Sequence, residues 1–184
     1  MDHPSTERGP LSPRSGFTLI ELVTVVTIVI ILAGVVVPRV SGFSDKAKYA
    51  KAANDMKSIK RALEYLYQDV GYFPADAGNG IDPGLNDASR VPAARRGDWR
   101  GPYIEAWPEV NPWGGAYRYR HRTVSYFDFD GVGGNEVEVV IRDNLSTDIH
   151  LAIDEIIDDG SLSTGMARTE NGFYRLYVGE GRSW

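Results

Sequence analysis

The sequence predicts an α+β fold, in which one long N-terminal helix packs on a small antiparallel sheet with an additional short helix. Two observations predict it. The first is an apolar run, Phe17–Val37, followed by apolar side chains at spacings of three and four as far as Val70. The second is a set of short alternating or apolar runs in the C-terminal third, which are typical of antiparallel strands.

The predicted helix covers residues 17–70, and its two halves differ in character. The run of 21 residues from Phe17 to Val37 is long enough to span a bilayer. Its Val and Ile content favours a strand in water. In lipid, however, a lone strand leaves its backbone N–H and C=O groups without hydrogen-bond partners, so a helix is expected. The second half is amphipathic and predicts one buried stripe, with Gly71 as the stop. The stripe consists of Met56, Ile59, Leu63, Leu66 and Val70.

The rest of the chain predicts a loop, short strands and one short helix. Residues 71–114 combine turn-forming residues with large aromatic ones, which indicates an ordered loop held by aromatic anchors. The expected strands are Tyr117–Arg120, Val124–Phe129, Val137–Ile141 and Phe173–Val178. An amphipathic helix over 149–157 has Ser146-Thr147-Asp148 as its N-cap and Asp158-Asp159-Gly160 at its end, as a C-cap rather than a ligand pair.

Composition and motifs exclude several classes of function. A formal net charge of −5 argues against a broad nucleic-acid-binding surface, so no nucleic-acid partner is expected. The absence of cysteine rules out disulfides and Cys-ligated zinc. His3, His121 and His150 lack metal-ligand spacing, and there is no nucleophile elbow, P-loop or dinucleotide motif. We therefore expect no enzyme and no required cofactor.

One carboxylate, Glu21, lies within the apolar run, and no charged residue occurs between Leu22 and Val37. A charged side chain in a membrane segment costs roughly 3 kcal/mol on insertion scales, so such a residue is expected to be functional and to have a partner. The residues before the run, 1–16, are rich in Pro and Ser and are expected to be a disordered leader. Cleavage at Gly16 would leave the apolar run on the mature protein.

The stretch Gly16-Phe17-Thr18-Leu19-Ile20-Glu21-Leu22, followed by the apolar run, resembles the class III signal of type IV pilins and type II secretion pseudopilins. This resemblance implies that a prepilin peptidase cuts between Gly16 and Phe17 and methylates the new Phe17 amine. The chain then comprises a cleaved leader (1–16), a transmembrane and polymerisation half of the helix (17–42) and a periplasmic globular pilin-like domain (43–184).

Glu21 and the Phe17 amine are spaced for assembly. They lie four residues apart, about 6 Å along a helix. A neighbouring subunit shifted axially by that distance brings its amine level with Glu21, and the resulting ion pair offsets the desolvation of both groups. The alternative is that Glu21 extends to a lipid headgroup in a plain membrane anchor.

Three motifs of the soluble part are similar to those of the major (G-type) pseudopilin. They are Gly71-Tyr72-Phe73-Pro74, Trp99-Arg100-Gly101-Pro102-Tyr103-Ile104 and Asn111-Pro112-Trp113-Gly114-Gly115-Ala116-Tyr117-Arg118-Tyr119. The last motif usually has Asp where Asn111 stands. The resemblance implies a structural subunit of a type II secretion pseudopilus, a helical filament that drives protein export. The alternative is a subunit of a surface type IV pilus that serves adhesion, motility or DNA uptake.

The same resemblance implies partners and a location. The expected partners are other copies of the chain in a homopolymeric filament, a prepilin peptidase, minor pseudopilins, and an inner-membrane assembly platform with its ATPase. The chain is expected in the bacterial inner membrane before assembly, as a single-pass protein with a periplasmic domain. The filament is then periplasmic, or lies on the cell surface if it is a pilus.

A calcium site is the remaining expectation from the resemblance, because the best-known members carry one in the loop before their C-terminus. The candidate ligands are Asp128, Asp130, the Gly134 carbonyl and Glu136, with Val132 standing where a further oxygen ligand is expected. Two interpretations stay open for this stretch. One is a weak calcium site, and the other is a bare hairpin turn with solvated acids.

Overall fold

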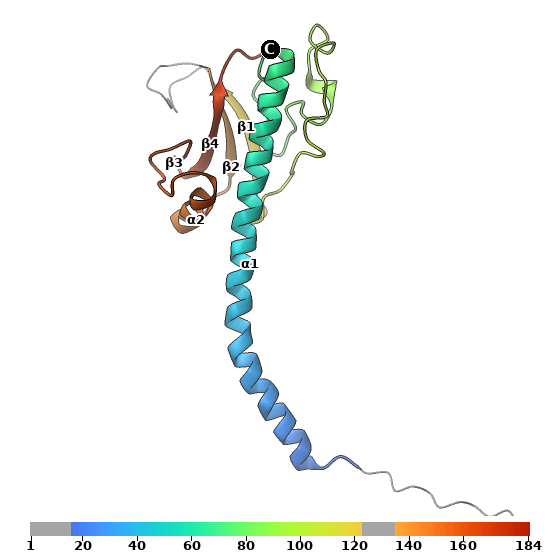
Figure 1. Ribbon diagram of the computed structural model, residues 1–184, viewed down its shortest axis with the longest axis vertical. Coiled ribbons are helices and arrows are strands. Elements are labelled where there is room, and N and C mark those ends of the chain that lie inside the picture. The colour runs from blue at the N-terminus through green and yellow to red at the C-terminus, as the bar shows by residue number, and fades with distance from the viewer. Residues whose placement is uncertain (1–15, 123–134) are drawn as a thin grey trace, which may run out of the picture. The chain divides into compact units, whose positions relative to one another are not determined.

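The structure is a computed structural model that describes residues 16–122 and 135–184, with the side chains of 35–41 outside the description. Its elements confirm the α+β class (Figure 1). They are α1 (Leu19–Val70), the short 3-10 helix η1 (Ala88–Arg90), β1 (Ala116–Arg122), β2 (Glu136–Arg142), α2 (Thr147–Ile157), β3 (Ala167–Glu170) and β4 (Phe173–Glu180). The chain divides into two compact units, Met1–Phe43 and Ser44–Trp184.

The first unit contains the N-terminal part of α1. Residues 16–18 precede the helix without regular structure. Large apolar side chains between Phe17 and Leu32 are exposed around the helix. Within the residues that are described, no helical stretch combines the length and the apolar character that crossing a membrane requires.

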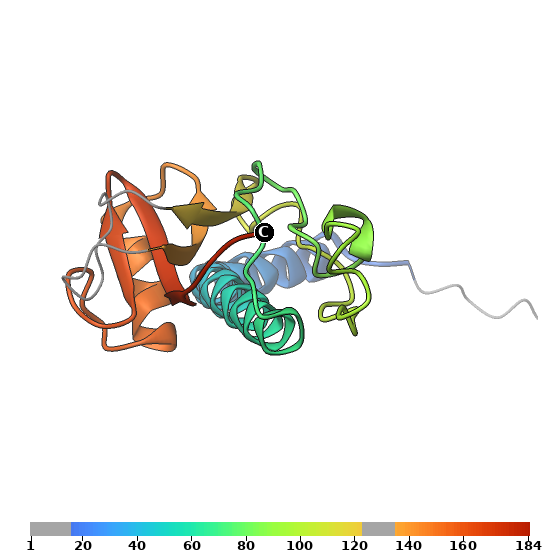
Figure 2. The ribbon, with the colours of Figure 1, turned by 90° about the horizontal axis from the view of Figure 1, so that it is seen from above.

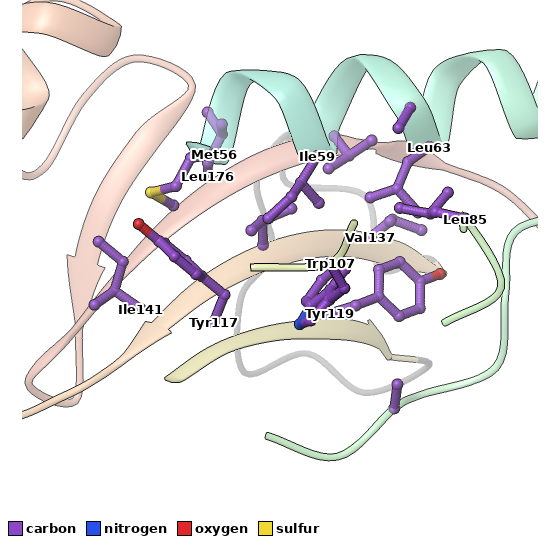
Figure 3. Packing of buried hydrophobic residues seen from close by; sticks show 14 of the residues in the cluster. Met56, Ile59, Leu63, Leu85, Trp107, Tyr117, Tyr119, Val137, Ile141 and Leu176 are labelled. Carbon is purple, nitrogen blue, oxygen red and sulfur yellow. The ribbon is translucent and has the colours of Figure 1, made fainter. Parts of the chain in front are cut away.

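In the second unit, the C-terminal part of α1 buries the predicted stripe. The five apolar side chains from Met56 to Val70 are all buried, and Figure 3 shows Met56, Ile59 and Leu63 among them. The helix ends as predicted at Gly71, which has a φ of 74° and donates its N–H to the Tyr67 carbonyl at 2.8 Å. A residue with positive φ and this hydrogen bond form the αL type of helix C-cap, which favours glycine.

The four strands form one antiparallel sheet in the order β1-β2-β4-β3. β1, β2 and β4 confirm three of the predicted strands, and the predicted strand Val124–Phe129 lies outside the described residues. β3 was not predicted from the sequence. Its four residues include one apolar side chain, Ala167, so neither alternation nor an apolar run marks it.

Alternate side chains of the sheet meet the two helices. Tyr117 and Tyr119 of β1 point into the core beside α1, together with Ile141 of β2 and Leu176 of β4 (Figure 3). α2 packs on this core through the buried Ile153. Its N-cap is Ser146, as predicted, although the serine side chain makes no capping hydrogen bond, and its C-cap is Asp158, also as predicted.

The long loop between α1 and β1 lies on one side of α1, with the sheet on the other side in both views (Figures 1 and 2). Trp107 is buried in the core, the Trp99 indole donates to the Gly84 carbonyl at 3.0 Å, and the Tyr103 hydroxyl donates to Asp69 at 2.8 Å. These contacts confirm that aromatic side chains hold the loop in place.

Candidate functional site

The predicted assembly residue, Glu21, is held by a hydrogen-bonded turn at the start of α1. Its carboxylate accepts hydrogen bonds from the Thr18 backbone N–H at 2.9 Å and from the Thr18 hydroxyl at 2.8 Å. The Glu21 N–H donates to the Thr18 hydroxyl oxygen at 3.3 Å. This reciprocal pattern is a capping box, in which the first and fourth residues of a Thr-x-x-Glu sequence satisfy each other's free backbone donors.

Thr18 is the functional residue that sequence reasoning missed at this site. The signal was present, because Thr18 and Glu21 have capping-box spacing directly before an apolar run. The capping box fixes the direction in which the Glu21 carboxylate points and uses part of its acceptor capacity. A carboxylate has about four lone-pair positions, so Glu21 retains acceptor capacity for another donor.

The surroundings of Glu21 are apolar and open. Phe17, Ile20, Thr24 and Val25 line a shallow hollow of about 330 Å³ together with the Glu21 carboxylate. Phe17, the residue at the predicted cleavage point, leaves 82% of its surface exposed, and Gly16 before it is also exposed. The predicted processing point is therefore accessible, and the acid faces a space that an incoming group can enter.

The exposed apolar surface extends beyond this hollow along the helix. Large apolar residues with about half or more of their surface exposed are Leu19, Ile20, Leu22, Val23, Val25, Val26, Ile28, Val29, Ile30, Ile31 and Leu32. A helix that is apolar on every side is stable only inside a large core, among other helices or in a membrane. The exposed apolar side chains of this part of α1 therefore need lipid or other helices to cover them.

The predicted calcium ligands are largely outside the description. Asp128, Asp130 and Gly134 belong to residues 123–134, and only Glu136 is described. Glu136 is a buried residue of β2, placed opposite Arg122 of β1 and Glu180 of β4. In the described parts of the chain, no group of three or more acidic or histidine side chains is arranged to hold a metal ion.

The buried polar residues of the domain fasten α2 to the sheet. The Tyr174 hydroxyl donates to Asp154 at 2.7 Å, and Thr169 hydrogen-bonds to His150 Nδ1 at 3.1 Å. Burial raises the pKa of Asp154 and lowers the pKa of His150. Because His150 and Asp154 are fully buried, they are out of reach of a substrate, and we assign them a structural role.

A second buried polar group lies on the opposite face of the sheet. Glu138 of β2 accepts a hydrogen bond from Arg175 of β4 at 2.6 Å, and Arg120 of β1 lies 3.7 Å from the same oxygen. All three side chains are buried. The charges of this cluster are paired within the chain, in contrast to that of Glu21.

Comparison with known proteins gives a consistent set of relatives. The chain is 35% identical to the type II secretion system core protein G of Pseudomonas aeruginosa over 126 residues, which cover 68% of this chain and 87% of that protein. It is 33% identical to the core protein G of Klebsiella michiganensis over 132 residues, covering 68% and 91%. It is 36% identical to the Aeromonas hydrophila protein of the same name over 106 residues, covering 57% and 71%.

A family model described as PilW, C-terminal, matches residues 44–133 of the chain. No solved structure matches the chain. The relatives align over most of their own length, so the similarity is not confined to the N-terminal signal.

Proposed function

Because the chain belongs to the family of the type II secretion system core protein G, we propose that it is a structural subunit of a type II secretion pseudopilus. The observation that carries the proposal is the exposed apolar part of α1. We expect such a surface in a protein that lies in lipid or packs against its own copies. Assembly into a helical filament buries these side chains between subunits, and this burial supplies most of the cohesion.

Processing creates the group that Glu21 binds. A prepilin peptidase cuts between Gly16 and Phe17 and methylates the new Phe17 amine. In the filament, this amine pairs with Glu21 of a neighbouring subunit. The proposal is supported by the exposure of Phe17 and by the open hollow at Glu21, which the capping box leaves accessible.

The inner membrane stores the subunit before assembly. The support for this step is the sequence, in which no charged residue interrupts Leu22–Val37. The domain that follows is periplasmic. An inner-membrane platform with its ATPase extracts the subunit and adds it to the filament, in which minor pseudopilins are further partners.

The alternative function, a subunit of a surface type IV pilus, is not better supported, since these relatives carry the name of a secretion protein. The relatives are named as core proteins of a secretion system, which favours a structural role over catalysis.

Calcium binding through Asp128, Asp130, Gly134 and Glu136 stays a proposal. It predicts that EGTA lowers the melting temperature of the domain, and an unchanged melting temperature would remove the site.

The capping box allows a sharp test of Glu21. Glutamine replaces glutamate in capping boxes, so Glu21→Gln keeps the hydrogen bonds with Thr18 and removes only the charge. We expect Glu21→Gln to insert into the membrane normally and to form no regular filaments when produced with the secretion machinery, as seen by electron microscopy. Normal filaments from this variant would show that Glu21 acts only as a capping residue, and would contradict the pairing.

A further inference from the structure

A hollow of about 290 Å³ lies on the domain between α1, the C-terminal end of α2 and the strands β3 and β4. Its apolar lining, here called the floor, consists of Ile157, Met166 and Leu176, and its cationic lining, here called the rim, consists of Lys57, Lys60 and Arg61 of α1. The three cations lie three and four positions apart and therefore share one helix face. Met166 is 38% exposed, so apolar surface is open at the floor.

The positive charge of the rim is only partly compensated within the chain. Lys57 donates to the Ile156 carbonyl at 2.6 Å and Lys60 to the Tyr177 carbonyl at 3.0 Å, and both acceptors are neutral. The acid of the lining, Asp158, accepts hydrogen bonds from the backbone N–H groups of Met166 and Ala167. An ammonium has three donors, so both lysines retain donors for an incoming carboxylate.

The electrostatics of Lys60 support this interpretation. Burial lowers the pKa of Lys60, although Glu64 and Asp158 act in the opposite direction. Glu64 is 3.9 Å away, at the limit of an ion pair. Because desolvation of the ammonium outweighs these acids, another carboxylate at the rim would be favourable.

The long loop on the other side of α1 presents a complementary surface. Val110 is 60% exposed, and its neighbour Glu109 is also exposed. Glu109 lines a separate hollow with two further acids, Asp82 and Asp87, so the surroundings are acidic. An apolar side chain beside a carboxylate matches an apolar floor with a cationic rim.

The position of Val110 is fixed by the turn that follows it. The buried Asn111 donates its N–H to the Gly115 carbonyl at 2.8 Å, and its side-chain oxygen accepts from the N–H groups of Trp113 at 2.8 Å and Gly115 at 3.2 Å. A preorganised loop loses little conformational entropy when it binds. Asn111 is thus a positioning residue for the exposed Glu109 and Val110.

The two surfaces are made by different segments of the domain, and the two hollows share no lining residue. The loop lies on one side of α1, and α2 with β3 lies on the other, in both views (Figures 1 and 2). Complementary surfaces on different faces of one subunit form heterologous contacts, which repeat from copy to copy and build an open filament when the rotation does not close.

We propose that the hollow lined by Lys57, Lys60 and Arg61 receives Glu109 and Val110 of a second copy of this chain. The inference rests on the proposed function, since it defines a contact between domains within the filament. Val110 covers the floor at Met166, and the Glu109 carboxylate meets the cationic rim.

Cysteine cross-linking tests the contact directly, because the chain contains no cysteine of its own. Chains with Val110→Cys and chains with Met166→Cys are produced together with the secretion machinery and mildly oxidised. We expect disulfide-linked dimers in the mixed sample well above either variant alone, since a disulfide requires Cα atoms within about 7 Å. The matched control pairs Met166→Cys with Asp98→Cys, an exposed position of the same loop, and should give a yield at background.

A charge exchange provides the second readout. Arg61→Glu and Glu109→Arg are each expected to reduce filament yield roughly fivefold by placing like charges at the contact, and the double variant should recover most of it. Both residues are exposed, so the melting temperature of each variant should stay unchanged.

The outcomes separate the two proposals. Filaments of the unaltered chain that give no Val110–Met166 cross-link above the control overturn this contact and leave the proposed function intact. Failure of the unaltered chain to form filaments in the presence of the machinery contradicts the proposed function, and the contact with it.

Discussion

The two described ends of α1 differ in how far their apolar side chains are exposed. Between Met56 and Val70 the helix places them on one stripe, and the sheet and the long loop cover it. Between Phe17 and Leu32 they surround the helix and are exposed. The stripe is covered by the chain itself, and we infer that lipid or other subunits cover the N-terminal part. On this inference the same element stabilises the domain at one end and drives assembly at the other.

Two carboxylates repeat this contrast. Glu138 lies in the sheet with Arg175 and Arg120 of the same chain as partners. Glu21 lies in an apolar stretch, with hydrogen bonds from Thr18. We infer that Glu138 stabilises the folded domain and that Glu21 acts in filament assembly. The following predictions test that separation. Because all four Trp residues lie in the domain, tryptophan fluorescence of the full chain in detergent reports the unfolding of the domain.

The largest effect is expected at Glu138. Glu138→Gln leaves two buried guanidinium groups without their carboxylate, which costs about 3–5 kcal/mol of unfolding free energy. Denaturant unfolding measures this loss. The matched variant Glu21→Gln should leave the unfolding curve of the domain unchanged, and an equal loss in both would contradict the separation.

The apolar side chains give the next comparison. Leu63→Ala opens a cavity in the core and should lower the unfolding free energy by about 2–5 kcal/mol. Ile28→Ala removes a similar side chain from the exposed part and should leave domain stability unchanged, as measured by the same unfolding curves. A loss of domain stability from Ile28→Ala would contradict the separation between the two parts of α1.

A pH dependence is expected from His150. Burial lowers its folded-state pKa below the ordinary value of 6.5, so the unfolded chain binds the proton more readily and stability falls as pH drops below about 6.5. The slope is at most about 1.4 kcal/mol per pH unit. Asp154, whose pKa is raised, acts with the opposite sign, so the difference between the unaltered chain and His150→Gln isolates the histidine. Identical slopes would exclude a neutral buried His150.

The smallest effect is expected at the end of α1. Gly71 has a positive φ and open space around its Cβ position, so Gly71→Ala suffers only backbone strain, about 1–2 kcal/mol. Gly34→Ala, in the other part of the helix, has ordinary helical backbone and should not reduce domain stability. Thermal melting of both variants is sufficient, and equal melting temperatures would argue against the αL cap.

The sequence predicted the features that repeat with a period. The buried stripe of α1 follows from spacings of three and four, and β1, β2 and β4 follow from short alternating or apolar runs. The stop of α1 at Gly71 was predicted from the residue type, because glycine favours the helix C-cap. β3 was missed because it holds a single apolar residue, although its pairing with β4 is a local hairpin in which Glu170 lies opposite Phe173. The sequence did carry a signal for this hairpin, the Asn171-Gly172 turn, in which both residues have positive φ. The ion cluster at Glu138 was not predictable, since Arg175 is distant in sequence and its position depends on strand order.

The candidate site was predicted in part. Glu21 stood out because a carboxylate in an apolar run is costly. Its capping role with Thr18 was not predicted, although the Thr-x-x-Glu spacing before the apolar run encodes it. The hollow with the cationic rim could not be predicted, because its floor and rim come from four separate segments. The calcium ligands and the Phe17 processing stay predictions.

The most direct test of the separation between the two parts of α1 is a cryo-electron microscopy map of the assembled filament at side-chain resolution. We predict that the side chains from Phe17 to Leu32 are packed against neighbouring subunits, with the Glu21 carboxylate beside the Phe17 amine of another copy. Filaments held together by the domains alone, with Phe17–Leu32 in contact with detergent or lipid, would contradict the account.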